Sequence, residues 1–180
     1  KKLSKMKIDK KLIKELVDNL KELLIKYKDR TVKVAAVTSC SNFTGIFTPY
    51  HQIAELMHQN DGLCFVDFAC SAPYININMH PENEEEHLDA IYFSPHKFLG
   101  GPGSSGVLIF NESLYHNQIT DTPGGGTVDW TNPWGKQAFV SNIEAREEGG
   151  TTGFLETIRT ASAIQLKEQM TVEKMLAREE

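Results

Sequence analysis

Five polar residues that can take part in chemistry follow the ends of predicted strands. They are Asn42 after the first strand, Asp67 at the end of the second, and Ser94, His96 and Lys97 after the third. In an open parallel sheet, ligands bind beyond the carboxyl ends of the strands, so we expect these side chains to meet at one edge. Each has a structural explanation when taken alone, because a strand-end Asp usually caps a helix or forms a turn. Their joint placement favours a binding or catalytic site.

The elements that must position these residues follow from the apolar pattern. Apolar runs predict short strands at 31–38, 63–67, 90–94 and 107–110. The first run is apolar at successive positions, which is typical of a buried parallel strand. A stripe over residues 9–27 predicts an amphipathic helix, and Thr48-Pro49 predicts the start of another. This alternation of strands and helices predicts crossover connections and a mostly parallel sheet.

Three further segments complete the predicted organisation. Residues 81–87 carry four glutamates and are predicted to be a solvated surface loop. Residues 120–135 are rich in glycine and proline and contain both tryptophans, which predicts an irregular excursion inside one domain. Residues 153–178 have apolar side chains near helical spacing and predict one long helix.

Composition and spacing argue against several classes of function. The net charge is −5, and the 12 Lys or Arg among the first 33 residues fit a solvated helix face better than a nucleic-acid or membrane surface. No apolar run approaches the ~20 residues of a membrane helix. Three cysteines without CxxC spacing argue against a disulfide framework. The pairs His51/His58 and His80/His87 lack zinc-motif spacing, so no metal site is expected. A protein of a reducing compartment, the cytoplasm, is the expectation.

Four motifs occur together in one order along the chain. They are Ser41-Asn42-Phe43-Thr44-Gly45, Asp67-Phe68-Ala69, Ser94-Pro95-His96-Lys97 with the Gly-rich turn after it, and Glu148-Gly149-Gly150-Thr151. This set resembles the class V aminotransferases of fold type I, the pyridoxal 5'-phosphate (PLP) group that contains cysteine desulfurases and selenocysteine lyases. The resemblance implies an α/β fold with a three-layer α/β/α core and a mostly parallel sheet. It covers nearly all of residues 1–180, as a partial PLP-binding large domain.

The resemblance also implies roles for the lysine and the aspartate. Lys97 would form the Schiff base with PLP, and it is the only lysine between Lys33 and Lys136. Asp67 would keep the pyridine nitrogen protonated, which the cofactor needs in order to act as an electron sink. These two are the expected catalytic residues.

The remaining expected cofactor contacts come from the same resemblance. Asn42 would contact the phenolic oxygen of PLP, and Ser94 and His96 its phosphate. Thr151 would reach the phosphate of a neighbouring subunit, which implies a homodimer with sites at the interface. Cys70 stands where family members commonly have Gln, and a thiol is a weaker hydrogen-bonding group than an amide. Two further departures are Thr152 in place of the usual Pro and a long interval before Lys97.

The expected function is that of a PLP-dependent enzyme acting on an amino acid, and the resemblance favours the cysteine desulfurase or selenocysteine lyase type. A class V transaminase, a kynureninase-like lyase and a non-catalytic α/β module that retains the fold are the alternatives. The family's upstream phosphate loop and its small C-terminal domain have no counterpart in these residues. The 180 residues alone are therefore expected to be weakly active or inactive.

Overall fold

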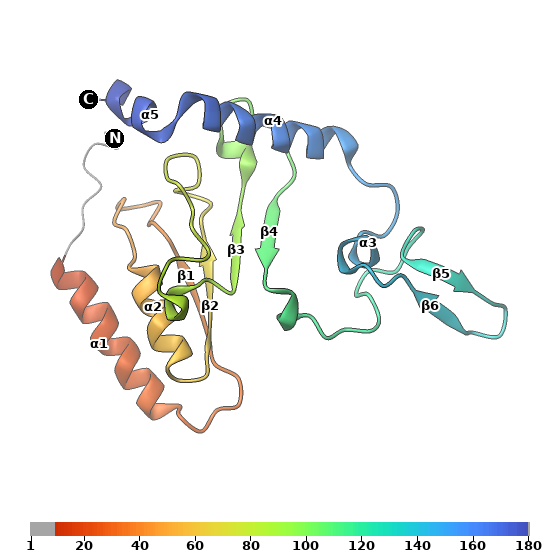
Figure 1. Ribbon diagram of the computed structural model, residues 1–180, viewed down its shortest axis with the longest axis horizontal. Coiled ribbons are helices and arrows are strands. Elements are labelled where there is room, and N and C mark those ends of the chain that lie inside the picture. The colour runs from red at the N-terminus through yellow and green to blue at the C-terminus, as the bar shows by residue number, and fades with distance from the viewer. Residues whose placement is uncertain (1–9, 180) are drawn as a thin grey trace. The chain divides into compact units, whose positions relative to one another are not determined.

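The computed structural model describes residues 10–179, and these form two compact units (Figure 1). The first unit contains the described residues up to 110 and those from 156 onward, and the second contains residues 111–155. None of the described helices is long and apolar enough to cross a membrane.

A four-stranded sheet forms the centre of the first unit. Its strands are β1 (Val34–Thr38), β2 (Leu63–Asp67), β3 (Ala90–Phe93) and β4 (Val107–Phe110), in that spatial order. The first three strands are parallel, and β4 runs antiparallel to β3 (Figure 1). The predicted mostly parallel sheet is thereby confirmed. Parallel pairing aligns Thr38 with Asp67 and Asp67 with Tyr92, so the three carboxyl ends share one edge.

Two helices cover one face of this sheet. α1 (Lys10–Lys26) and α2 (Tyr50–His58) direct apolar side chains toward the strands, and for α1 the apolar stripe over residues 9–27 predicts this. Their contribution to the buried core is Leu24, Ile53, Ala54 and Met57, which pack with Cys64 and Val66 of β2. α2 begins at Tyr50 with Pro49 at its N-cap, so the predicted capping by Thr48 does not occur.

The first strand is less buried than its sequence predicts. β1 is parallel to β2 as expected, but Val34, Ala36 and Thr38 are exposed while Ala35 and Val37 are half-buried. Val34 retains 44% of its accessible surface. The reason is that β1 lies at the edge of the described sheet and packs on helices through one face only.

The C-terminal segment forms two helices rather than the single one predicted. α4 (Phe154–Met170) and α5 (Val172–Glu179) are separated by Thr171, whose φ of 54° lies in the left-handed region. A helix cannot continue through that conformation. The Thr171 hydroxyl accepts a hydrogen bond from the Lys174 backbone N–H at 3.4 Å, within the first turn of α5.

The second unit contains a hairpin where an irregular excursion was predicted. Strands β5 (Val128–Thr131) and β6 (Gln137–Phe139) pair antiparallel, and α3 (Ile143–Glu147) follows them. The Asn132 side chain accepts hydrogen bonds from the backbone N–H groups of Trp134 and Lys136 in the turn. Glycines and prolines surround these short strands, so the sequence lacks a clear alternation of apolar and polar residues that would predict them.

Candidate functional site

Asp67 lies at the carboxyl end of β2, where the sequence analysis placed it. One carboxylate oxygen accepts a hydrogen bond from the Ala69 backbone N–H at 2.7 Å, which fixes the turn that follows the strand. Tyr92 stands beside it on β3, and burial followed by the Asp67 charge raises the pKa of its phenol. This end of β2 therefore presents a half-buried carboxylate with one oxygen engaged by the backbone.

A shallow pocket of about 370 Å³ opens at this carboxylate. It is lined by Asp67, Ala69, Tyr92, Phe93, Ser94, Gly106, Val107 and Leu108. The structure thus brings Asp67 and Ser94 together from two adjacent parallel strands, as predicted from the ends of those strands. The walls are otherwise mainly apolar, and sequence reasoning had not identified Tyr92 or Leu108 as part of them.

Lys97 ends a short 3-10 turn, η3 (Pro95–Lys97), directly after β3. The Lys97 backbone N–H donates to the Ser94 carbonyl at 3.0 Å, and buried Pro95 occupies the first position of the turn. Gly101 closes on this turn so tightly that any side chain there would clash with the Pro95 carbonyl oxygen. His96 and Lys97 are exposed and do not line the pocket, and Lys97 forms no ion pair with any residue of the described chain.

Asn42 lies in the loop that follows β1. The Ser41 hydroxyl accepts hydrogen bonds from the backbone N–H groups of Phe43 and Thr44, which shapes this loop and leaves the Asn42 side chain exposed. The Ser39 and Ser71 hydroxyls are 2.5 Å apart and connect the two chain segments beyond β1 and β2. Asn42 is therefore near the same edge of the sheet but outside the pocket beside Asp67.

Cys70 is half-buried three residues after Asp67 and interacts with the buried Cys40. Burial, and then the charge and hydrogen bond of Cys70, raise the pKa of Cys40 to about 11. Thr151 belongs to the second unit, where it is exposed. The structure describes one chain, so the expected contact of Thr151 with a neighbouring subunit stays a prediction.

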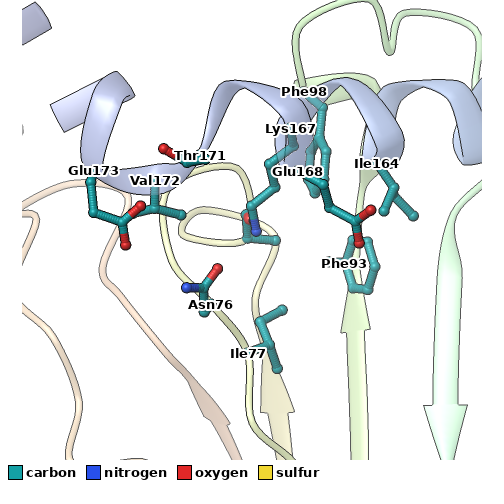
Figure 2. Close-up of a pocket in the computed structure, with 11 residues that line it drawn as sticks. Asn76, Ile77, Phe93, Phe98, Ile164, Lys167, Glu168, Thr171, Val172 and Glu173 are labelled. Atoms are coloured by element: carbon teal, nitrogen blue, oxygen red, sulfur yellow. The ribbon is translucent and has the colours of Figure 1, made fainter.

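A second pocket, of about 440 Å³, lies between α4, α5 and the loops after β2 and β3 (Figure 2). Lys167 extends into it from α4, and its ammonium donates to the carbonyls of Ala72 at 2.6 Å and Ile75 at 2.5 Å. Burial lowers the pKa of Lys167. Sequence reasoning missed this residue, because nothing in the sequence indicates that Lys167 reaches the carbonyls of the loop after β2.

Comparisons with known proteins identify the family. The chain matches the family "Aminotransferase class-V" over residues 2–180, and it therefore belongs to that family. The resemblance stated from the four motifs is confirmed.

Individual relatives agree with this assignment. The chain is 27% identical over 143 residues to a probable cysteine desulfurase of Halalkalibacterium halodurans, covering 79% of this chain and 34% of the relative. It is 29% identical over 153 residues to "Probable cysteine desulfurase 1" of Mycobacterium leprae, covering 82% and 23%. The chain thus spans between about a quarter and a third of the length of these relatives.

A crystal structure of a cysteine desulfurase from Escherichia coli has the same fold in the region it shares with this chain. Its TM-score is 0.72 at 24% identity, over 88% of this chain and 37% of that one. At this identity the likeness is evidence for the fold alone. It agrees with the predicted large-domain architecture of fold type I.

The residues beside Asp67 fit the cofactor that this family implies. A PLP ring needs a carboxylate for its protonated nitrogen and apolar walls for its faces, and its phosphate needs hydroxyl or N–H donors. The pocket supplies the Asp67 carboxylate, the Ser94 hydroxyl and the apolar side chains of Val107 and Leu108. Ser94 is the N-cap of η3 but makes no side-chain capping hydrogen bond there. Its hydroxyl is therefore available to a ligand.

Proposed function

We propose that this chain forms part of the cofactor-binding domain of a PLP-dependent cysteine desulfurase. The observation that carries the proposal is the placement of Lys97. Its backbone N–H donates a hydrogen bond to the Ser94 carbonyl, and Ser94 shares a pocket with Asp67 of the adjacent parallel strand. A selenocysteine lyase belongs to the same proposal, because selenocysteine differs from cysteine only in the chalcogen atom.

The residues of this chain would divide the work of holding the cofactor. Asp67 would keep a proton on the pyridine nitrogen, since it lines the pocket and its Oδ1 accepts the Ala69 N–H. Ser94 and His96 would donate to the phosphate. Asn42 would donate to the phenolic oxygen, with Cys70 beside the ring. When bound, PLP supplies the electron sink that stabilises negative charge at Cα of an amino acid.

Lys97 has two tasks in this proposal. It would attach the cofactor covalently as a Schiff base in the resting enzyme. After release by the substrate, its neutral amine would take the proton from Cα and return it at a later step. The exposed side chain, which has no ion-pair partner in the described chain, leaves the amine available for both tasks.

Cysteine is the proposed substrate because the relatives reported above are named cysteine desulfurases. The residues that distinguish a desulfurase from a transaminase or a kynureninase-like lyase lie in the family's small domain, outside the segment that this chain matches. A non-catalytic module that retains the fold is the alternative from a different class. A cytoplasmic homodimer in which Thr151 contacts the neighbouring site completes the proposal.

Reduction with borohydride tests the role of Lys97 directly. The full-length protein is loaded with PLP, reduced and digested, and we expect the pyridoxyl mass on the peptide that contains Lys97. K97A should lose this label, whereas K136A, the matched control at the next lysine along the chain, should keep it. Label on Lys33 or Lys136 would refute the assignment. Release of sulfide from cysteine, measured on the same preparations, separates a desulfurase from the non-catalytic module.

A further inference from the structure

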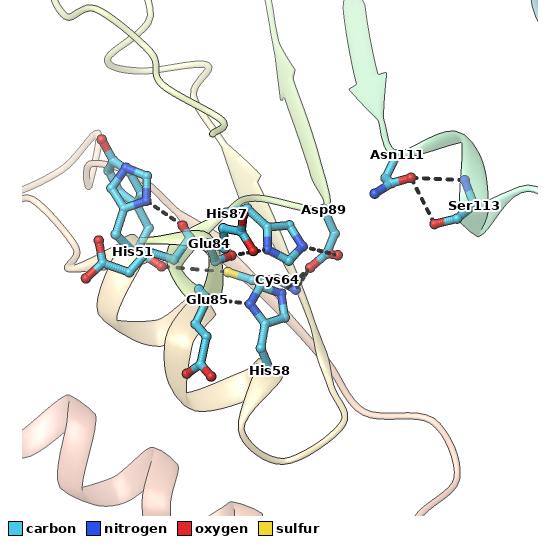
Figure 3. A network of polar contacts seen from close by, with 11 residues as sticks. His51, His58, Cys64, Glu84, Glu85, His87, Asp89, Asn111 and Ser113 are labelled. Carbon is cyan, nitrogen blue, oxygen red and sulfur yellow. Dashed lines mark hydrogen bonds and ion pairs between the residues drawn. The ribbon is translucent and has the colours of Figure 1, made fainter. Parts of the chain in front are cut away.

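Two histidines and an aspartate form a cluster of side chains (Figure 3). It lies at the end of the sheet opposite to the one that carries Asp67. His58 is the last residue of α2, His87 follows the short helix η2 (Glu84–Glu86), and Asp89 immediately precedes β3. Asp67 ends a strand, whereas Asp89 stands before one, and β2 and β3 are parallel. The cluster is therefore separate from the candidate cofactor site.

The three side chains face one another at short distances. His58 Nε2 is 2.9 Å from Asp89 Oδ2, and His87 Nε2 is 3.3 Å from Asp89 Oδ1. The two imidazole rings are stacked with centroids 4.0 Å apart and an interplanar angle of 8°. The Asp89 side chain is only 6% exposed, and its Oδ2 also accepts the Cys64 backbone N–H at 2.7 Å. A buried carboxylate thus has a ring nitrogen opposite each of its two oxygens.

Backbone carbonyls fix which ring nitrogens carry protons. His58 Nδ1 is 2.5 Å from the Glu85 carbonyl oxygen, and His87 Nδ1 is 2.6 Å from the Glu84 carbonyl oxygen. A carbonyl oxygen can only accept, so each Nδ1 must be the donor. In a neutral ring with its proton on Nδ1, Nε2 has a lone pair and no proton. Both Nε2 lone pairs would then face the carboxylate oxygens, which are also acceptors.

That arrangement lacks positive charge between the nitrogens and the carboxylate. One ligand atom from each of the three side chains lies within 4.8 Å of the others, so one divalent cation between them can supply that charge. The glutamates of η2 add negative charge to this face of the molecule.

We propose that His58, His87 and Asp89 bind a divalent late first-row transition metal ion, with Zn²⁺ as the representative. Two imidazoles and one carboxylate suit Zn²⁺, Co²⁺ or Ni²⁺, whereas Mg²⁺ and Ca²⁺ prefer oxygen ligands alone. The Nδ1–H bonds to backbone carbonyls and the N–H bond to Asp89 are the outer contacts that orient metal ligands in known sites. Binding requires the parallel rings to tilt so that their lone pairs converge on one ion.

Such a metal ion would join three segments that are distant in sequence. It would tie the end of α2 to the 81–89 connection and to the start of β3, and thereby hold the β2–β3 crossover against the sheet. Sequence spacing predicted no metal site, because the histidine pairs seven residues apart do not match a zinc motif. Here the ligands come from separate segments, and the fold brings them together.

Cobalt and zinc titrations of the untagged full-length protein test this site. After dialysis against a chelator, Co²⁺ should give a visible d–d absorption that saturates at one equivalent per chain, and Zn²⁺ should displace it. Zn²⁺ but not Mg²⁺ should raise the melting temperature. H87Q should weaken binding by at least the ~10–100-fold that loss of an outer contact causes in known sites.

His51 provides the matched control. Its Nδ1 contacts the Glu86 carbonyl oxygen at 2.8 Å in the same loop, but it is not one of the three clustered residues. H51Q should therefore bind Co²⁺ like the wild type. D89N removes the charge and keeps a side-chain acceptor for the Cys64 N–H; if it does not fold, H87Q decides alone, because His87 is the more exposed histidine at 31%.

Three results would overturn the proposal. They are the absence of Co²⁺ binding at micromolar concentrations, equal Co²⁺ affinity of H87Q and the wild type, and an intense near-ultraviolet thiolate band, which would show that a cysteine binds the ion.

Discussion

The three cysteines show how burial gives identical side chains different chemistry. Burial, and then the neighbouring Cys70, raise the pKa of the Cys40 thiol to about 11. Burial, and then the Asp89 carboxylate, raise the pKa of Cys64 to about 12. Because the thiolate is the nucleophile, each unit of increase lowers the reactive fraction about tenfold. Cys40 and Cys64 are therefore structural thiols, and Cys70 is the half-buried one.

Alkylation kinetics should separate the three thiols. At mildly alkaline pH, iodoacetamide should label the half-buried Cys70 first and Cys40 and Cys64 more slowly, because both are buried and their raised pKa values leave little thiolate. Peptide mass spectrometry over time measures the order. C70S should remove the fast phase. In C64S, the matched control at a buried position, the fast phase should remain, and labelling of Cys64 before Cys70 would contradict the expected order.

At the scale of residues, sequence reasoning predicted those site features that depend on strand ends. Asp67 and Ser94 lie in one pocket because parallel strands end at the same edge, and this rule needs no side-chain detail. The same rule predicts nothing about the side chains that line a pocket wall, such as Leu108. It also predicts nothing about Lys167, whose two carbonyl partners lie 95 and 92 residues away in the sequence. Contacts of that kind depend on packing in three dimensions.

At the scale of elements, two charged side chains attach α4 to the loops that follow β2 and β3. Arg159 is exposed and donates to the Pro102 carbonyl at 3.1 Å, and Lys167 is the more buried of the two. The Lys167 ammonium donates to two carbonyls of the loop after β2 and lies 5.6 Å from the centre of the Phe98 ring (Figure 2). The buried Ala163 packs in the core one turn earlier on the same helix. This combination holds α4 over the loops that follow β2 and β3.

Replacing Lys167 with Met should destabilise the first unit by about 1–3 kcal/mol, because two carbonyls lose their donor in a partly buried place. Urea unfolding measures the loss, and hydrogen exchange should show faster opening along α4. K174M is the matched control, since Lys174 is exposed on α5. Equal stability of K167M and the wild type would mean that water replaces the ammonium without cost.

The element boundaries that sequence predicted best are those set by apolar runs alone. The ranges of β2 and β4 agree with the expectation, and α1 agrees within the described residues. The exposure of β1, the break at Thr171 and the β5–β6 hairpin did not follow from the sequence. The first depends on which faces are covered, the second on one residue in a left-handed conformation, and the third on pairing between short strands.

At the scale of the whole molecule, the second unit has its own polar centre. The Glu147 carboxylate accepts a hydrogen bond from the Tyr115 hydroxyl and another from the Thr120 hydroxyl at 3.0 Å. The Arg146 guanidinium lies 5.2 Å from the centre of the Tyr115 ring. The Tyr115 bond is the largest cause that lowers the pKa of Glu147 below its ordinary value of 4.5. The carboxylate form is therefore favoured when this unit is folded.

This shift makes the stability of the second unit depend on pH with a definite sign. A carboxyl group whose pKa is lower in the folded state stabilises above its unfolded pKa, here near 4.5, and loses that contribution as the pH falls through the folded value. Acid should therefore weaken the second unit. Y115F should lower stability at about pH 7, and its difference from the wild type should shrink in acid, at a pH below the lowered pKa of Glu147.

Tryptophan fluorescence during urea unfolding measures this effect, because both tryptophans, Trp130 and Trp134, lie in the second unit. Y74F is the matched control in the first unit, and it should leave the tryptophan transition unchanged at both pH values. A Y115F deficit of the same size at both pH values would show that the phenol acts through packing rather than through the charge on Glu147. A deficit that closes in acid would assign the stabilisation to the hydrogen bond between Tyr115 and the ionised carboxylate.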